Sequence, residues 1–181
     1  DYRIVEQSSD SVTFLLDSEE GLAIRRSYQI APTGPEAEEY LIKHSTTFEN
    51  TSATAINHRT IYYNLGTARP ISNGRIASNY LNVGYFDGED AEFIRTNKLT
   101  GSKGLLGLGS NAPQDLINVT ARMQWTSVKN QFFASVLSSN VAANELLIYP
   151  VAAPPTDDAQ PSHTGLTGSA GYDVGTIAPG A

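Results

Sequence analysis

Tyr40-Leu-Ile-Lys-His-Ser-Thr-Thr-Phe-Glu-Asn50 is the stretch that decides the fold class, because its side chains alternate in character along its length. Every second residue from position 40 to position 48 would lie on one face of an extended chain. These residues are mainly apolar or aromatic, whereas those between them are mainly polar. A period of two is typical of a β-strand with one buried face. The Asn50-Thr51-Ser52 sequence that follows predicts a turn.

The segments on either side continue this pattern. Residues 12–16 and 22–30 alternate in the same way, and Asp17-Ser-Glu-Glu-Gly21 between them predicts a hairpin turn. Residues 53–65 predict a further strand. Consecutive strands with short connections favour an antiparallel meander with one buried face. The fold class is therefore predicted to be mainly β.

The remainder of the chain is less regular. Residues 66–115 predict a long excursion with short strands around 76–85 and 92–95, and long connections of this kind are often functional. Residues 119–137 predict a strand, one helical turn at 127–131 and another strand, and 145–151 predict a further strand. The C-terminal part, 154–181, is rich in Pro, Gly, Ser and Thr and predicts mostly loop, with one strand at 172–177. We expect a single domain over 1–181.

Composition restricts the function classes. Of the 181 residues 40% are hydrophobic, which suffices for a buried core. The net charge is −7, which disfavours nucleic-acid binding. There are no cysteines, which excludes disulfides and thiolate metal sites. No stretch has the roughly 20 apolar residues that a membrane-spanning helix requires.

Few residues suggest chemistry. Of the three histidines, His44 and His58 lie on adjacent predicted strands, and we expect His44 to be a hydrogen-bonded core residue and His58 to lie near a surface, while His163 lies in the C-terminal part. The glycine-rich residues 101–109 lack the Gly-Lys-Ser/Thr ending of a phosphate-binding loop. No Gly-x-Ser-x-Gly elbow occurs. We therefore predict no catalytic, cofactor-binding or metal-binding residue and no enzymatic activity.

The aromatic residues are more informative. Large aromatic side chains bury the most area, so Trp125, Phe132 and Phe133 are expected to anchor a core. Tyr80, Tyr85 and Phe86 cluster in the long excursion and form the candidate partner surface, because exposed tyrosines often mark recognition sites. The alternative is that these three side chains cap the open edge of a β-sandwich.

One block carries a resemblance to a known family. Trp125-Thr-Ser-Val-Lys-Asn-Gln-Phe-Phe-Ala-Ser-Val-Leu137 resembles the Trp-Val-Ala-Val-Lys-Asn-Gln-Phe-Phe-like segment in the large periplasmic domain of YidC-type membrane protein insertases. Residues 21–28, 40–52 and 177–180 resemble other parts of that domain in order and spacing. The match covers most of the chain loosely, and only the block from Trp125 to Leu137 is specific.

The resemblance implies a fold, a location and partners. The fold would be an antiparallel β-supersandwich, similar to galactose mutarotases, on the periplasmic side of the bacterial inner membrane. The partners would be membrane proteins under insertion, the Sec translocon and SecDF, and no catalytic residue or cofactor is carried over. The family's domain begins earlier and ends later, so the sandwich would be truncated at both ends. Its unpaired strand edges would favour an edge-mediated homodimer of the isolated domain.

Two other functions remain open. A carbohydrate-binding or mutarotase-like module of the cell envelope would need an aromatic cleft with acid and base groups, and His44 and His58 with a glutamate are the candidates. Sugar-dependent fluorescence of Trp125 would separate this reading from protein binding. An inert structural domain of the envelope fits the low charge and the Thr-rich strands equally well.

Overall fold

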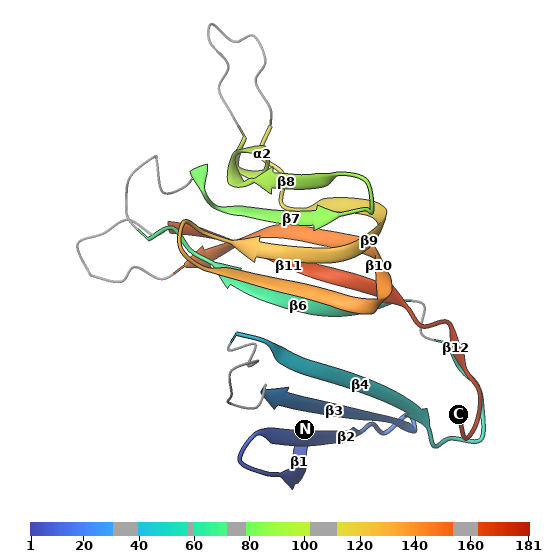
Figure 1. The fold of residues 1–181 in the computed structure, drawn as a ribbon. Helices are drawn as coiled ribbons and strands as arrows, with labels where there is room; N and C mark the ends of the chain where they lie inside the picture. The colour runs from blue at the N-terminus through green and yellow to red at the C-terminus, as the bar shows by residue number, and fades with distance from the viewer. Residues whose placement is uncertain (31–39, 58–59, 72–78, 102–111, 154–162) are drawn as a thin grey trace, which may run out of the picture. The chain divides into compact units, whose positions relative to one another are not determined.

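The computed structural model describes residues 1–30, 40–57, 60–71, 79–101, 112–153 and 163–181 (Figure 1). These residues are mainly in antiparallel strands, which confirms the predicted fold class. The chain divides into two compact units instead of the expected single domain. Unit 1 comprises Asp1–Arg59 and Val174–Ala181, and unit 2 comprises Thr60–Asp173. The mutarotase-like supersandwich remains a prediction.

The strands predicted at 12–16, 22–30 and 40–48 lie in unit 1, whereas the strand predicted at 53–65 as the next of the meander is divided between the two units. The four-stranded sheet of unit 1 has the order β1-β2-β3-β4. The turn predicted at 17–21 joins β2 to β3, and Gly21 adopts φ 80°, a conformation that glycine tolerates best. The bounds are β1 (Arg3–Gln7), β2 (Ser11–Asp17), β3 (Leu22–Ile30) and β4 (Ile42–Asn50). The edge-mediated homodimer stays a prediction, with β1 and β4 as the edges of this sheet.

The alternation that decided the fold class is visible as cross-strand packing in unit 1. Tyr28 on β3 is paired with His44 on β4, and their rings stack with centroids 4.5 Å apart. Phe14 on β2 meets Tyr28 edge-on at 6.1 Å. Such pairs on one face are a main source of sheet stability.

Asn50 joins the end of β4 to the C-terminal residues. Its buried side chain donates hydrogen bonds to the carbonyls of Thr54 (2.7 Å) and Ile177 (2.9 Å). Its Oδ1 accepts hydrogen bonds from the backbone amide and the hydroxyl of Ser52. Ile177 belongs to β12 (Thr176–Ile177), which pairs with the short strand β5 (Ile56–Asn57) that follows Asn50 in the chain. The C-terminal residues therefore belong to unit 1 although 127 positions separate Asn50 from Ile177.

Unit 2 is a six-stranded sheet in the order β6-β11-β10-β9-β7-β8. The sheet curls, so that strands distant in this order come close together. An added Cβ on Gly168 of β11 would lie only 3.0 Å from the side chain of Val83 on β7, three strands away. The bounds are β6 (Thr60–Ala68), β7 (Asn82–Phe86), β8 (Ala91–Arg95), α2 (Thr96–Thr100), β9 (Ile117–Lys129), β10 (Ala134–Ala153) and β11 (His163–Asp173).

The curled sheet encloses the core of unit 2. Aliphatic residues from every strand and from α2 contribute, and the most deeply buried include Leu81, Val83, Leu99, Met123, Leu146, Ile148 and Leu166. Burial of these side chains is the main favourable term in folding of this unit.

Two sequence expectations for unit 2 are wrong. The predicted helical turn at 127–131 is strand up to Lys129 followed by a tight turn. The part predicted as loop, 154–181, contains β11, which pairs with both β10 and β6. Its small residues look like loop in the sequence, but Gly165, Gly168 and Gly171 each lie so close to neighbouring atoms that a side chain would crowd them. In the described part of the chain, no helix has the length and apolar character needed to cross a membrane.

Candidate binding surface

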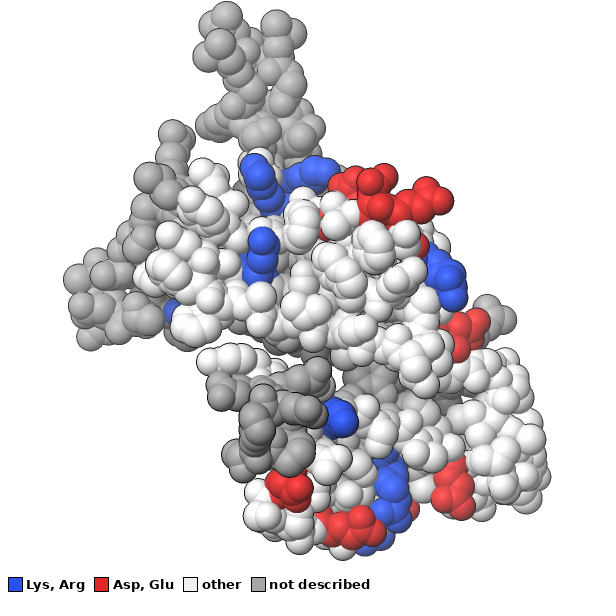
Figure 2. Space-filling view, viewed as in Figure 1, with Lys and Arg blue, Asp and Glu red and all other residues white. Residues whose placement is uncertain are grey.

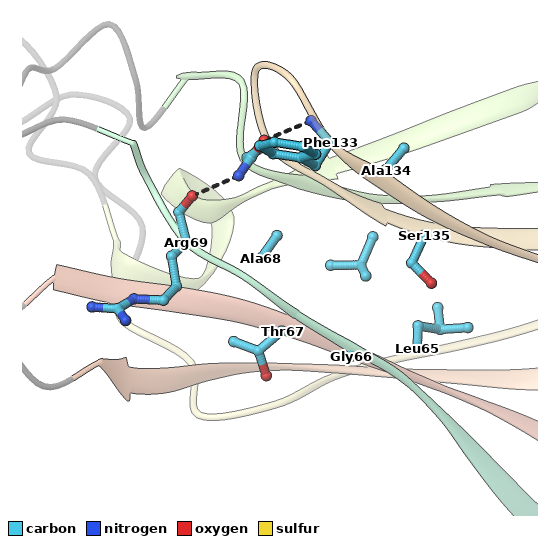
Figure 3. Close-up of a pocket in the computed structure, with 10 residues that line it drawn as sticks. Leu65, Gly66, Thr67, Ala68, Arg69, Phe133, Ala134 and Ser135 are labelled. Atoms are coloured by element: carbon cyan, nitrogen blue, oxygen red, sulfur yellow. Dashed lines mark hydrogen bonds between the residues drawn. The ribbon is translucent and has the colours of Figure 1, made fainter. Parts of the chain in front are cut away.

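A groove of about 410 Å³ lies within unit 2 (Figure 3). One wall is the end of β6 and the residue after it, and the other is the hairpin that joins β9 to β10. The first wall consists of Leu65, Gly66, Thr67, Ala68 and Arg69, and the second of Val128, Asn130, Phe133, Ala134 and Ser135.

The β6 wall presents backbone as well as side chains. Five consecutive residues line the groove, and because successive side chains of a strand point to opposite faces, the edge of the strand must face it. Among the described strands, β6 pairs only with β11, so its other edge has no ladder partner. Between the pairs Ser169–Asn64 and Thr167–Thr67, β6 carries one extra residue, and Gly66 there has φ 89°. Bulges of this kind often adjoin binding sites.

Asn130 connects the two walls. Its Nδ2 donates to the carbonyl of Arg69 (3.0 Å), and its Oδ1 accepts from the backbone amides of Phe132 (3.0 Å) and Phe133 (2.9 Å). Figure 3 shows the bonds to Arg69 and Phe133 as dashed lines. This side chain therefore fixes the hairpin turn and the end of the groove together.

The prediction that Phe132 and Phe133 anchor a core is wrong. Their side chains are 68% and 74% exposed. Asn130 donates its backbone amide to the carbonyl of Phe133 (2.9 Å), which closes a tight turn. A turn at the end of a hairpin has few neighbours to cover it, so both phenylalanines stay largely exposed, although Phe133 also lines the groove.

Trp125 was also expected in the core, but it is only half-buried and belongs to an aromatic face on β7, β8 and β9. Its ring stacks with Phe86 at 6.0 Å and lies 6.3 Å from the tilted ring of Phe93. Phe93 covers Gly84, where an added Cβ would come within 2.6 Å of the ring. The ammonium group of Lys129 lies 4.9 Å from the centre of the Phe93 ring.

Tyr80, Tyr85 and Phe86 do not form one partner surface. Tyr85 and Phe86 are adjacent on β7 and therefore point to opposite faces, Tyr85 against the core and Phe86 onto Trp125. Burial, assisted by the carboxylates of Glu92 and Asp87, raises the pKa of Tyr85. Tyr80 is exposed and precedes the strand. Removing all three side chains would therefore disturb the core as well as the surface.

The residues considered for acid–base chemistry are not brought together. His44 lies in unit 1, where its Nε2 is 3.0 Å from the hydroxyl of Thr46, His58 is outside the described residues, and His163 begins β11 in unit 2. No group of three or more metal-binding side chains occurs among the residues that the structure describes.

Sequence reasoning missed Glu145, which accepts hydrogen bonds from the Tyr62 hydroxyl and the Asn118 amide. The bond to Glu145, together with burial, raises the pKa of Tyr62.

The environment of His44 predicts a pH dependence. Burial, with a smaller contribution from Arg26, lowers the pKa of His44 below its ordinary 6.5. The unfolded chain then binds a proton more readily than the folded one, so the free energy of unfolding rises with pH between the lowered pKa and 6.5. We expect urea titrations between about pH 5 and about pH 8 to show this rise. His44→Phe keeps a ring against Tyr28 and should reduce the dependence of the free energy of unfolding on pH. If the variant shows the same dependence as the wild type, other groups are responsible for it.

Comparison with known protein families, with curated proteins and with solved structures finds no match to this chain. The geometry of unit 2 is therefore the basis for its functional interpretation.

Proposed function

We propose that this chain is a non-catalytic, β-rich binding domain that takes short, extended, apolar segments of other proteins into the groove between β6 and the β9–β10 hairpin. The single observation that carries the proposal is the groove itself, in which the edge of β6 that has no ladder partner among the described strands lies beside apolar walls. A strand edge offers backbone hydrogen bonds to an extended peptide, and flanking pockets select alternate side chains.

The groove suits such an occupant in its chemistry. Leu65, Ala68 and Val128 supply apolar contact, and Thr67 and Ser135 supply small polar groups. Asn130 holds the walls together, so the site is formed before binding and loses little conformational freedom on occupation.

The resemblance of residues 125–137 to YidC-type insertases gives the proposal its biological setting. In that setting the domain would lie on the periplasmic side of the bacterial inner membrane and assist insertion through protein contacts. The extended segments would belong to membrane proteins under insertion, with the Sec translocon and SecDF as further partners. The block that resembles the family forms the hairpin wall of the groove.

Peptide binding tests the proposal. We expect a fluorescein-labelled heptapeptide of alternating valine and serine to bind saturably in an anisotropy titration. Ser135→Trp fills the groove, and it should weaken binding at least about tenfold, as expected when a buried contact site is blocked. Asn140→Trp, at an exposed position of the same strand, is the matched control and should bind as the wild type does. Absence of saturable binding, or equal affinity in the Ser135→Trp variant, would contradict a peptide site in this groove.

A carbohydrate-binding module is the second candidate, and the aromatic face of Phe86, Trp125 and Phe93 favours it. Partly exposed aromatic rings offer apolar surface to the faces of sugar rings. A saturable change of Trp125 fluorescence on titration with simple sugars, with no effect of the heptapeptide, would place this function first.

A further inference from the structure

The β9–β10 turn carries two exposed phenylalanines, of which only Phe133 lines the groove. Phe132 and Phe133 are both mostly exposed, and Phe132 does not line the groove. Exposed large apolar side chains that are held in place usually mark a contact with a protein or a membrane. The hydrogen bonds of Asn130 to the amides of both residues hold this turn in one conformation. The pair is therefore presented as a fixed, convex apolar tip.

Basic residues gather at the same end of the sheet. Arg95 on β8 and Lys129 on β9 are both paired with Asn82 on β7, so they occupy one row on one face, and Lys129 is the last residue of β9 before the turn. Lys98 follows on α2. Arg69 also lies close to the turn, because its backbone carbonyl accepts a hydrogen bond from the Asn130 side chain. This end of the unit carries a concentration of positive charge although the whole chain has a net charge of −7.

The acidic residues of these strands lie at their other end. Asp87, Glu89 and Asp90 form the turn between β7 and β8, where Asp87 accepts two backbone amides, and this turn lies beyond the Phe86–Trp125 pair, away from Lys129. Figure 2 shows the separation, with basic side chains over α2 and the adjoining strand ends and acidic ones over the β7–β8 turn. The charge distribution is thus polarised along the strands, with the basic end at the phenylalanine tip.

We propose that the β9–β10 tip inserts Phe132 and Phe133 into the interface of an anionic lipid membrane, with Arg95, Lys98 and Lys129 against the headgroups. A convex apolar tip needs a medium that deforms around it, and basic residues beside it are complementary to anionic lipid. A protein pocket would instead have to enclose the tip within a ring of positive charge.

Vesicle sedimentation tests the proposal with the whole chain. We expect the protein to bind vesicles of phosphatidylglycerol and phosphatidylcholine more tightly than vesicles of phosphatidylcholine alone. Phe132→Ser with Phe133→Ser should weaken binding at least about tenfold, since two phenyl rings no longer enter the interface. Arg95→Gln and Lys98→Gln should each weaken binding about fivefold. Val141→Ser, an exposed valine on β10, is the matched control and should leave binding unchanged.

A label reports insertion directly. The chain has no cysteine, so Phe132→Cys provides a single attachment point for an environment-sensitive fluorophore. We expect its emission to shift to the blue with anionic vesicles, while the same label at Val141→Cys should not respond. Because both positions are exposed, the variants should unfold at the temperature of the wild type.

Two results would overturn the proposal. One is that the wild type does not bind vesicles, or that the Phe132→Ser, Phe133→Ser variant binds them as tightly as the wild type does. The other is a monomer–dimer equilibrium that the same variant abolishes without vesicles, which would make the tip an interface between two copies of the chain. Phe133 lines the groove and Phe132 does not, so the single variant Phe132→Ser separates this proposal from the proposed function. It should weaken vesicle binding and leave heptapeptide binding unchanged.

Discussion

Replacing Asn50 by alanine is expected to lower the free energy of unfolding by about 2–4 kcal/mol. The Asn50 side chain is fully buried, and its amide donates to the carbonyls of Thr54 and Ile177 while its Oδ1 accepts two hydrogen bonds from Ser52. Alanine makes none of these bonds, and the carbonyl of Ile177 loses the donor of its buried hydrogen bond. The loss of a buried polar partner costs more than the bond itself contributes on average.

Urea unfolding followed by far-ultraviolet circular dichroism measures this effect. Asn57→Ala is the matched control, because Asn57 is exposed on the nearby strand β5 and should change stability by less than about 0.5 kcal/mol. Asn50→Asp should be destabilising as well, since a carboxylate accepts from Ser52 but cannot donate to Ile177. A stable Asn50→Ala variant would mean that the C-terminal residues are held in unit 1 by other contacts.

The largest effect in unit 2 is expected from Leu146→Ala, with a loss of about 2–5 kcal/mol. Leu146 on β10 is completely buried within the aliphatic core of the curled sheet. Its neighbours on β10 are paired with β9 on one side and with β11 on the other, so the backbone is held on both sides. The sheet therefore cannot close around the missing side chain, and a cavity remains.

Trp125 provides the readout for this variant, because it is the only tryptophan and lies in unit 2. Val141→Ala is the matched control on the same strand, where the side chain is 56% exposed and little burial is lost. We expect the Leu146→Ala transition to occur at clearly lower urea concentration and the Val141→Ala transition to coincide with that of the wild type. Coincident transitions for all three proteins would mean that the core of unit 2 relaxes around the deletion.

Both of these predictions depend on contacts that the sequence could not reveal. Asn50 is recognisable as a turn residue, since Asn-Thr-Ser is a typical turn sequence, but its bond to Ile177 spans most of the chain. The strand β11 was missed because its glycines and small polar residues resemble a loop. Gly168 is required there by the close approach of Val83 on β7, which is a property of the curled sheet, whereas Gly165 and Gly171 are crowded by the adjacent strands β6 and β10.

The candidate site was the least predictable feature. Trp125, Phe132 and Phe133 were assigned to a core on the basis of size, and the structure places Trp125 on an outer face and the two phenylalanines on a turn. Residue type alone does not show which side of a strand is covered. Asn130 is the signal in the sequence that could have corrected this, because Asn is favoured in turns and Phe132 and Phe133 follow it within three residues.

The sequence by itself determined the mainly β class, the antiparallel strands within residues 12–50 and the turn at 17–21, because a period of two and turn-forming residues act over a few positions. The tertiary structure alone decided the division into two units, the inclusion of β11 in the sheet and the exposure of the aromatic residues. Those outcomes depend on which strand edges pair and how strongly the sheet curls. Such contacts join residues far apart in the chain, and no local pattern in the sequence encodes them.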